Sequence, residues 1–449
     1  MSDNRTSRRT LLKTAFASAG ALGLGGLIPS SVLGANDRIN LAIIGIRGRG
    51  KEYFGQWTKI PGVRIAALCD VDENLFETRA QELEKVQGVR PMVETDLRRV
   101  MDDQGIDAVA IATPNHWHAL AAIWAIQAGK DVYVEKPVSH TIAEGRKIVE
   151  AARTYNRIVQ TGSQYRSNPM VRLAVEFIHG GGIGEIYMAR CAVYRPRESI
   201  GRGRIVDVPP GVNFDLWLGP ARSRPFIDNR FHYNWHWFWD TGDGETGNNG
   251  PHSVDIARWA MRKTEHPRRV QSMGGLYTFD TDQETPNTQV SCMEYADGSL
   301  VQLEVRNLFT NLDGDVREGV LFYGSKGWLE IIIGWSWASF LGRENEPGPR
   351  MTREEASERY DELTAAGTKA DPHFVNFIEC VRSRKADGLA ADILEGHYAA
   401  VMCHLCNIAY RTGRTLSFDS KNERFPDDPD AQALVVGTYR KPFVMPEKI

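Results

Sequence analysis

The chain lacks the features that mark several large classes of protein. Basic and acidic side chains nearly balance, with 54 Lys and Arg against 57 Asp and Glu. No long block carries one sign, so nothing favours nucleic acid as a partner. The 42 glycines and 21 prolines are too few among 449 residues for a fibrous or low-complexity chain. What remains is an ordinary globular composition, long enough for two domains of roughly 100 to 200 residues each.

Cysteine is scarce, and its positions do not suggest disulfides. Four of the six cysteines are isolated in the sequence, namely Cys69, Cys191, Cys292 and Cys380. Cys403 and Cys406 lie three residues apart in a stretch with a helical pattern, where a disulfide would strain the helix. His397 and His404 nearby do not complete a zinc-binding spacing. We therefore expect free, packed thiols and no metal site.

No run of residues is long and apolar enough for a stable bilayer span, which takes about 20 strongly apolar residues. At the N-terminus, Arg8 and Arg9 precede an uncharged stretch that is short and rich in glycine. An arginine pair before a weakly hydrophobic core is the twin-arginine export pattern. We predict that residues 1–35 are a cleaved export leader, with the twin-arginine translocase as partner and the periplasm as location. A Sec leader with an accidental arginine pair is the alternative.

Residues 37–160 alternate short apolar runs with longer helix-like stretches. The strand-like runs are Ile39–Ile44, Arg64–Cys69, Ala108–Ala112, Asp131–Val134 and Ile158–Gln160. The helix-like stretches include Glu73–Val86, His116–Ala128 and Ile142–Tyr155. Short strands separated by helices of this length predict a parallel, doubly wound sheet. We expect an N-terminal Rossmann domain over residues 37–160.

After Ser163 the pattern changes to longer alternating runs, which are typical of antiparallel strands. These runs are Ile186–Tyr194, Val270–Asp280, Thr288–Tyr295, Ser299–Leu308, Val316–Tyr323 and Gly327–Ile333. Helices are expected at Pro169–His179, His373–Arg384 and Glu395–Arg411. The prediction is a C-terminal α+β domain with a large, mainly antiparallel sheet over residues 161–412, then a strap over 413–449. The whole chain would be of the α/β class.

A glycine-rich turn follows the first predicted strand. Gly45, Gly48 and Gly50 lie between that strand and the first helix, where unpaired backbone N–H groups favour a dinucleotide pyrophosphate. Asp70 ends the second strand, where a carboxylate can accept both ribose hydroxyls of an adenosine and would repel a 2′-phosphate. NAD is therefore favoured over NADP. Arg47 stands where the second glycine of the fingerprint belongs, so its side chain must turn aside for the phosphates.

Three further motifs follow in order, at Thr113–His118, Glu135–Pro137 and Asn249–Asp255. With the glycine turn they resemble the Gfo/Idh/MocA family of glucose-fructose oxidoreductase and inositol dehydrogenase, over Asn40 to about Arg411. The resemblance implies a homo-oligomeric, NAD-dependent oxidoreductase. It also implies further cofactor contacts, at Thr113, Asn115, His118, Glu135, Lys136 and Gln164.

Lys136 and His252 are the predicted proton-transfer residues. Lys136 directly follows a strand, at the carboxyl edge of the parallel sheet, where such folds bind ligands. Its ammonium would stabilise a developing alkoxide. His252 would accept the hydroxyl proton near neutral pH. The family has an Asp four residues before this His, whereas this chain has Asn248, which can orient a hydroxyl but cannot take a proton. Asp255 is predicted near the substrate, where it either orients His252 or caps local structure.

The segment from Phe231 to Asp240 is unusually rich in aromatic residues. Eight of the nine residues from Phe231 to Trp239 carry rings when histidine is counted. Rings with polar tips suit the apolar faces and hydroxyl edges of a sugar, so Trp235 and His236 are predicted substrate contacts. A packed core or a subunit contact is the alternative.

These features together predict an exported, NAD-dependent oxidoreductase that acts on a secondary hydroxyl of a carbohydrate or polyol. A bacterial envelope offers no obvious NAD pool, so the cofactor would be held tightly and recycled in place. One alternative is a redox-neutral, NAD-dependent glycosidase or lyase of the same fold. The other is a non-catalytic sugar-binding protein that has lost its cofactor, for which Arg47 and Asn248 are the only indications.

Overall fold

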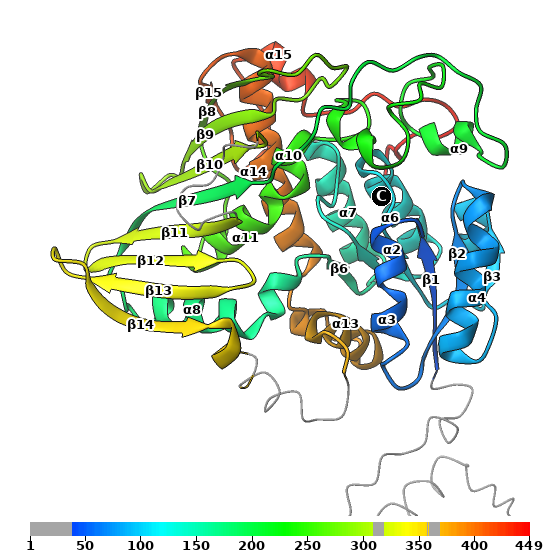
Figure 1. The fold of residues 1–449 in the computed structure, drawn as a ribbon, viewed down its shortest axis with the longest axis horizontal. Helices are drawn as coiled ribbons and strands as arrows, with labels where there is room; N and C mark the ends of the chain where they lie inside the picture. The colour runs from blue at the N-terminus through cyan, green and yellow to red at the C-terminus, as the bar shows by residue number, and fades with distance from the viewer. Residues whose placement is uncertain (1–37, 309–317, 357, 359–368) are drawn as a thin grey trace, which may run out of the picture. The chain divides into compact units, whose positions relative to one another are not determined.

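The computed structural model describes residues 38–308, 318–356, 358 and 369–449. The predicted leader, residues 1–35, lies outside these ranges. Among the described residues, no helix has the length and apolar character needed to cross a membrane. The chain from Ile39 onward forms one unit built on two sheets (Figure 1).

The first sheet has six parallel strands in the order β3-β2-β1-β4-β5-β6. They are β1 (Ile39–Ile44), β2 (Val63–Cys69), β3 (Met92–Glu94), β4 (Ala108–Ile111), β5 (Asp131–Val134) and β6 (Val159–Thr161). This is the Rossmann order, so the predicted doubly wound sheet is confirmed. The edge strand β3 is absent from the predicted strands, because it has only three residues and its Met92 and Val93 are exposed.

Helices flank this sheet and position its loops (Figure 1). They are α2 (Arg49–Glu52), α3 (Phe54–Trp57), α4 (Phe76–Gln87), α5 (Leu97–Asp102), α6 (Asn115–Gln127) and α7 (Ile142–Thr154), with the short 3-10 helix η3 (Glu73–Leu75). Residues of β1, β4 and β5 are almost completely buried, which explains their short, continuous apolar runs. A capping box between Thr141 and Glu144 fixes the start of α7. From the second half of the chain, α13 (Pro372–Ser383) adds Phe374, which stacks on Tyr133 with ring centroids 5.3 Å apart.

The second sheet has nine strands in the order β14-β13-β12-β11-β7-β10-β9-β8-β15. They are β7 (Ile186–Tyr194), β8 (Arg269–Gly275), β9 (Thr288–Glu294), β10 (Leu300–Arg306), β11 (Glu318–Gly324), β12 (Gly327–Ile332), β13 (Ser336–Leu341), β14 (Glu346–Thr352) and β15 (Leu416–Ser417). Only β7 and β10 pair in parallel, so the predicted mainly antiparallel sheet is confirmed. No strand was expected from the sequence at β13, β14 or the two-residue β15.

β8 ends at Gly275, five residues before the predicted end at Asp280. Its partner strand starts opposite Gly275, at Thr288. Beyond this point the Asn287 side chain takes over the backbone of Tyr277, accepting from its N–H at 3.1 Å and donating to its carbonyl at 2.8 Å. The Asn287 amide thus replaces β9 as the hydrogen-bond partner, and the pairing of β8 with β9 ends here.

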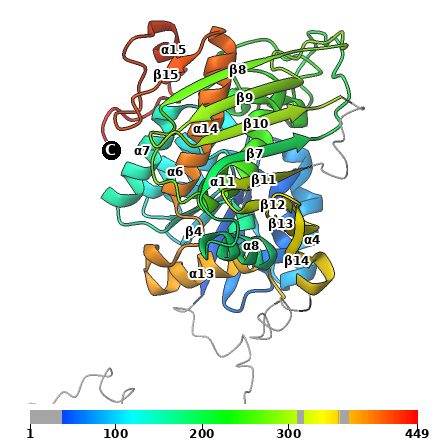
Figure 2. The same cartoon turned by 90° about the vertical axis from the view of Figure 1, so that its left-hand side faces the viewer.

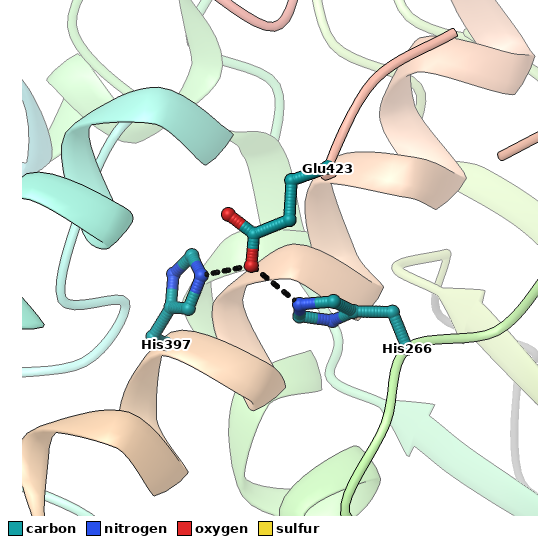
Figure 3. Close-up of side chains that lie close together, drawn as sticks. All are labelled: His266, His397 and Glu423. Atoms are coloured by element: carbon teal, nitrogen blue, oxygen red, sulfur yellow. Dashed lines mark hydrogen bonds and ion pairs between the residues drawn. The ribbon is translucent and has the colours of Figure 1, made fainter. Parts of the chain in front are cut away.

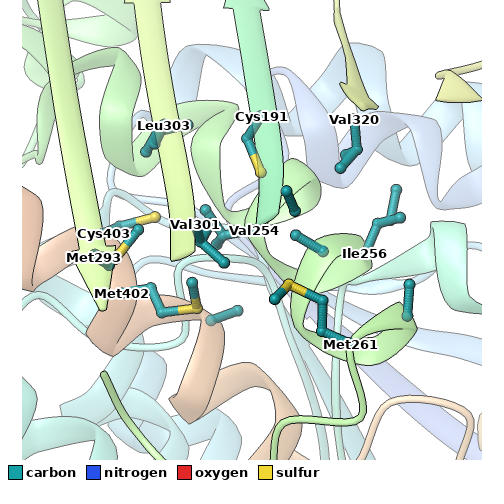
Figure 4. Packing of buried hydrophobic residues seen from close by; sticks show 14 of the residues in the cluster. Cys191, Val254, Ile256, Met261, Met293, Val301, Leu303, Val320, Met402 and Cys403 are labelled. Atoms are coloured by element: carbon teal, nitrogen blue, oxygen red, sulfur yellow. The ribbon is translucent and has the colours of Figure 1, made fainter. Parts of the chain in front are cut away.

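The remaining helices are α8 (Pro169–His179), α9 (Phe214–Leu218), α10 (Gly244–Asn248), α11 (Gly250–Ala260), α14 (Ile393–Thr412) and α15 (Pro429–Ala433), with 3-10 helices η4 (Gln164–Ser167), η5 (His232–Trp237) and η6 (Ala386–Gly388). α8, α11 and α14 lie against one face of the nine-stranded sheet (Figure 2). Figure 4 shows the core between them, where Cys191 and Leu303 of the sheet face Val254 of α11. α14 also contacts α7 and β6, so it joins the two sheets.

The six cysteines are all unpaired, as predicted. Five of them are buried, and only Cys292 on β9 is partly exposed. Cys403 and Cys406 lie on α14 and pack into the core as small apolar groups.

Candidate active site

A cavity of about 800 Å³ lies at the carboxyl ends of β1, β2, β4 and β5. The strand order reverses between β1 and β4, and such a point is where doubly wound sheets bind ligands. Residues of η5, α10 and α11 line the cavity from the second half of the chain. The predicted site residues that line it are Gly45, Arg47, Gly48, Asp70, Thr113, Asn115, His118, Glu135, Lys136, Gln164, Trp235, His236, Asn248 and His252. Gly50 and Asp255 are not among the lining residues.

Close backbone contacts shape the glycine turn. Gly45 has a φ of +86°, and a Cβ there would lie 2.6 Å from the carbonyl oxygen of Ala112. A Cβ on Gly50 would lie 1.8 Å from the carbonyl oxygen of Gly45, so both positions require glycine. Arg47 is half exposed and turns its side chain toward Asp72, with 3.4 Å between Nη1 and Oδ2. The Arg47 side chain is thus engaged away from the backbone of the turn.

Asp70 ties the end of β2 to the glycine turn. Its Oδ2 accepts a hydrogen bond of 2.8 Å from the Ile46 N–H, and its Oδ1 accepts one of 3.1 Å from the Asp72 N–H. Burial raises the pKa of Asp70 to about 6, while the two backbone hydrogen bonds oppose the shift. The carboxylate is therefore ionised at neutral pH and held where it can accept the hydroxyls of a ribose.

Arg49 and Tyr53 form a buried cluster with Glu135. Glu135 Oε1 accepts from Arg49 Nε and from the Tyr53 hydroxyl, each at 2.7 Å. Burial favours the neutral acid, but the Arg49 guanidinium and the Lys136 ammonium outweigh it and lower the pKa of Glu135 to about 2. The cluster joins the glycine turn to the end of β5. The sequence analysis missed Arg49 because no motif spacing links it to a partner 86 residues away.

Lys136 reaches from the end of β5 toward the second half of the chain. Its Nζ donates a hydrogen bond of 2.6 Å to the backbone carbonyl of Asn248, the last residue of α10. Burial lowers the pKa of this lysine. The Asn248 side chain donates from Nδ2 to the Tyr233 hydroxyl at 3.2 Å. Asn248 therefore holds the lysine through its backbone and presents its amide beside Tyr233, a cavity residue that the sequence analysis did not select.

His252 lies in the first turn of α11 and is 6% exposed. Neither of its ring nitrogens hydrogen-bonds to another described residue. Tyr165, which no motif indicated, meets the ring edge-on with centroids 4.9 Å apart. Burial and the Lys136 charge hold the pKa of His252 well below its usual value. The imidazole is thus neutral at neutral pH and able to accept a proton.

Two more buried polar atoms of cavity residues lack a hydrogen-bond partner in the described part of the chain. They are Thr113 Oγ1 and Gln164 Oε1. Buried polar groups of native proteins are nearly always satisfied. Together with the His252 ring, these atoms fit a polar group bound at this end of the cavity, as the nicotinamide end of a dinucleotide would be.

His118 and Asn115 are engaged within the protein. The His118 ring places Nδ1 2.6 Å from the Pro137 carbonyl and Nε2 2.8 Å from the Thr113 carbonyl, so it fixes the loops after β4 and β5. Burial lowers the pKa of His118. Asn115 donates from Nδ2 to Asp243 Oδ2 at 2.9 Å. Asp243 is a further residue that sequence motifs did not indicate.

The aromatic segment divides between the cavity and the core. Trp235 and His236 stack with ring centroids 3.5 Å apart, and both line the cavity. His236 Nδ1 lies 2.6 Å from the Tyr233 carbonyl, and burial lowers the pKa of this ring to about 3. Trp237 and Phe238 are buried away from the cavity lining. Part of the segment thus lines the cavity, where the predicted substrate contacts would lie, and part of it packs in the core.

Asp255 lies in a buried ion-pair network outside the cavity lining. Its two oxygens accept from Arg166 at 2.7 and 2.8 Å, and Arg258 lies 3.6 Å away. Arg166 also donates to Glu395 of α14 at 2.8 Å. Asp255 makes no hydrogen bond to His252 among the described contacts, so its visible role is to join η4, α11 and α14.

A second polar cluster holds the C-terminal segment. Glu423 Oε1 accepts from Nε2 of His266 at 2.7 Å and from Nε2 of His397 at 2.8 Å (Figure 3). Arg146 pairs with the same carboxylate. The spacing of these groups could accommodate a metal ion. A cation would have to displace both Nε2 protons and sit beside the Arg146 guanidinium, so the geometry favours a hydrogen-bonded anchor.

Comparison with protein families and curated proteins shows which proteins this chain resembles. An oxidoreductase family model with an NAD-binding Rossmann fold matches residues 39–163, and the C-terminal α/β domain of the same family matches 200–320 and 357–445. Levoglucosan dehydrogenase from Pseudarthrobacter phenanthrenivorans is 41% identical over 196 residues, 42% of this chain and 43% of the relative. A glycosyl hydrolase family 109 protein from Saccharopolyspora erythraea is 28% identical over 206 residues, 41% of this chain and 44% of the relative. The match thus spans less than half the length of each relative.

Solved structures share the fold over most of the chain. An oxidoreductase domain protein from Kribbella flavida has a TM-score of 0.65 at 18% identity, covering 85% of this chain and 99% of that chain. A levoglucosan dehydrogenase in complex with NADH and levoglucosan has a TM-score of 0.63 at 17% identity, covering 85% of this chain and 100% of that chain. At these identities the likeness concerns the fold.

With both family models matched in order, the chain belongs to the Gfo/Idh/MocA oxidoreductase family and carries its NAD-binding Rossmann domain.

Proposed function

We propose that the protein oxidises a secondary hydroxyl of a carbohydrate or polyol with NAD as hydride acceptor. The observation that carries the proposal is that Lys136 and a neutral His252 line the same cavity as Asp70 and the glycine turn. Trp235 and other aromatic side chains of that cavity suit a sugar. Relatives named as levoglucosan dehydrogenases support the carbohydrate class.

The chain's own residues would divide the proton work. When bound, NAD supplies the hydride acceptor. Lys136 Nζ would exchange its bond to the Asn248 carbonyl for the substrate oxygen and stabilise the negative charge that develops there. The His252 ring, which makes no hydrogen bond to the part of the chain that the structure describes, would take the hydroxyl proton. The Asn248 amide and the Tyr233 hydroxyl would orient neighbouring hydroxyls.

The test is a sugar and polyol panel assayed with the purified protein, following nicotinamide absorbance. We expect at least one secondary alcohol to reduce NAD. Lys136→Met should slow that reaction by about 10² to 10⁴-fold, the range typical of acid–base groups, while NAD still binds. The proposal fails if no panel member reduces NAD, whether the NAD is bound or added.

A redox-neutral glycosidase is the second candidate, and the glycosyl hydrolase family 109 relatives favour it. Such an enzyme would oxidise a ring hydroxyl, eliminate the leaving group, add water to the unsaturated ketone and return the hydride, so Lys136 and His252 would serve the same roles. A nitrophenyl α-N-acetylgalactosaminide distinguishes the two candidates. Release of nitrophenol without net NADH supports the glycosidase, whereas net NADH formation from a free sugar supports the dehydrogenase.

We also propose that the protein is exported by the twin-arginine translocase and keeps its cofactor. The Arg8 and Arg9 pair supports this route, which carries folded proteins. An enzyme without an external NAD pool must re-oxidise NADH in place, by a second carbonyl substrate or by return of hydride to the same sugar. Protein purified from the periplasm and dialysed extensively should retain nicotinamide and turn over only with an acceptor sugar. Empty protein that needs continuous NAD would contradict the closed cycle.

We propose further that the protein forms a homo-oligomer through the face of the nine-stranded sheet that lies opposite α8, α11 and α14. Met273 of β8 and Val290 of β9 are paired on that face and are 74% and 40% exposed. Exposed apolar side chains across adjacent strands favour a partner surface. Light scattering after size-exclusion chromatography should give more than one chain mass, and Met273→Glu should lower it. A monomeric unaltered protein would rule out this assembly.

A further inference from the structure

A second cavity, of about 390 Å³, lies elsewhere in the fold and shares no lining residue with the first. One face of α14 forms part of its wall, through side chains that are three, four and seven residues apart and so share a helix face. These are His404, Asn407, Ile408 and Arg411. The rest of the wall includes the start of α7, the segment around Asp243 and the C-terminal strap from Ala433 to Tyr439. Four residues before η5 also line it, namely Pro220, Ala221, Arg222 and Arg224.

Two buried side chains on this wall have polar atoms that are not satisfied by the described residues. His404 is 4% exposed and Asn407 is 5% exposed. His404 Nε2 and Asn407 Oδ1 are buried and have no hydrogen-bond partner among the described residues. Asn407 is otherwise fixed, since its Nδ2 donates to the Asp243 carbonyl at 2.9 Å. Polar atoms left in this state are costly unless a bound group satisfies them. Asn407 Oδ1 can only accept, so a hydroxyl of the ligand, and not an oxyanion, would satisfy it.

The charges around the cavity favour an anion. Its carboxylates are all engaged by nearby cations or N–H groups, and they are Glu144, Asp240, Asp243 and Glu284. Among the described residues, Arg411 makes no hydrogen bond or ion pair, and its guanidinium lies 5.0 Å from the Trp239 ring. Arg222 on the same rim is likewise without an ion partner in the described contacts. Arg411 and Arg222 therefore carry positive charges without a partner at ion-pair distance among the described residues, although the Asp243 and Glu284 carboxylates act on the Arg411 charge from farther away. The Arg411 guanidinium also lies beside an aromatic ring.

Asp243 connects the two cavities. Its Oδ2 accepts from Asn115, which lines the cofactor cavity, at 2.9 Å. Its Oδ1 faces the second cavity, 3.7 Å from His404 Nδ1 and 4.0 Å from His140 Nε2. An anion beside His404 would favour the protonated ring and draw Asp243 toward it. The hold of Asp243 on Asn115 would then change.

We infer that the second cavity binds a small ligand bearing an oxyanion, of monosaccharide size, and that Asp243 couples this binding to the cofactor cavity. The oxyanion is a carboxylate or a phosphate, which Arg411 and Arg222 recognise alike. This inference does not depend on the proposed reaction, because it concerns binding at a separate site.

Calorimetry on the full protein with NAD present tests the site. The probes are glucuronate, glucose 6-phosphate, inorganic phosphate and uncharged glucose. Saturable binding of glucuronate identifies a carboxylate ligand, and binding of either phosphate probe identifies a phosphate ligand. Arg411→Gln should weaken that binding about tenfold or more, since it removes a charged hydrogen-bond donor. Arg414→Gln is the matched control, because Arg414 lies outside the cavity lining and pairs with Asp428.

Two results would overturn the site: no oxyanion probe binds, or Arg411→Gln binds the oxyanion probes as tightly as the unaltered protein does. Glucose is the control for sugar binding at the first cavity, which Arg411→Gln should leave unchanged. The coupling is tested by NAD affinity with and without a saturating oxyanion probe. We expect a change of about fivefold or more in the unaltered protein, the lower end of typical allosteric coupling, and none in Asp243→Asn. An unchanged NAD affinity in the unaltered protein would overturn the coupling.

Discussion

At the scale of single residues, the site holds groups whose charge states differ because their surroundings differ. Glu135 stays ionised beside Arg49, although it is buried. His252 stays neutral because it is buried beside the Lys136 charge. Alcohol oxidation requires a neutral base beside a cation that binds the reacting hydroxyl, and His252 and Lys136 provide this combination. The surroundings of each side chain, more than its identity, define its role.

Asp70 should decide the preference for NAD. Asp70→Ala removes a carboxylate that would bind ribose hydroxyls and repel a 2′-phosphate. A hydrogen bond to a charged group contributes about 1.5–3 kcal/mol, so NAD affinity should fall about 10 to 100-fold while NADP affinity falls less. Calorimetry with both dinucleotides measures the difference between the affinities for NAD and NADP. Asp96→Asn, which also removes one charge at the cavity, is the control, and equal NAD and NADP affinities in the unaltered protein would refute the assignment.

His252 should determine the pH below which kcat/KM falls. Its pKa lies well below the usual value, and a base works only while it is unprotonated. The rate kcat/KM should therefore hold as pH falls through about 6.5, where an ordinary histidine would begin to protonate, and drop only at lower pH. His252→Ala should lower the rate by about 10² to 10⁴-fold. The fall of kcat/KM at low pH should disappear in the same variant. A mutant with near-normal rate would remove His252 from the mechanism.

At the scale of elements, the fold brings distant segments to one edge. The glycine turn and the loop after β5 meet because the parallel strands end at one edge, and the packing of the second half of the chain brings the start of α11 to them. The C-terminal strap is held in turn by Glu423, whose pKa is lowered by His266, His397 and Arg146 against the effect of burial. The strap supplies part of the second cavity, so its anchoring bears on that site as well.

Glu423→Ala should destabilise the protein by about 3–5 kcal/mol, because it leaves Arg146 and two histidines without their shared acceptor. Urea unfolding measures the effect. Glu447→Ala is the control on the same segment, since Glu447 is exposed, and its effect should stay within about 0.5 kcal/mol. If zinc raises the melting temperature of the unaltered protein and not of Glu423→Ala, the cluster is a metal site and the anchor assignment is wrong.

At the scale of the whole molecule, histidine burial should govern acid stability. Burial lowers the pKa of nine of the eleven histidines, which are His116, His118, His232, His236, His252, His266, His373, His397 and His404. The unfolded chain protonates them near pH 6.5, so it binds more protons than the folded state below that pH, and stability must fall as pH falls.

For a buried histidine with a folded pKa of about 4, such as His116 or His397, the loss approaches about 3 kcal/mol by pH 4. Urea midpoints measured from pH 7.5 to pH 4 should therefore decline steadily below about 6.5. His116→Gln should reduce the slope. A flat profile over this range would show that these rings are not held neutral in the folded state.

The sequence by itself determined the class of fold and indicated many of the residues that line the larger cavity. Strand and helix periods, the glycine turn and Asp70 are local signals, and parallel strands must end at one edge, so Lys136 and Thr113 follow from strand position. Short edge strands such as β3 and the added strands β13 and β14 carry weaker local patterns, and only pairing with a neighbour defines them.

Only the tertiary structure decided which side chains meet across long separations. It joined Arg49 to Glu135, placed Tyr165 against His252 and moved Asp255 out of the cavity into its pairs with Arg166. It also brought α14 and the C-terminal strap together to enclose a second cavity. Such contacts depend on packing between elements, and the spacing of residues along the chain carries no record of them.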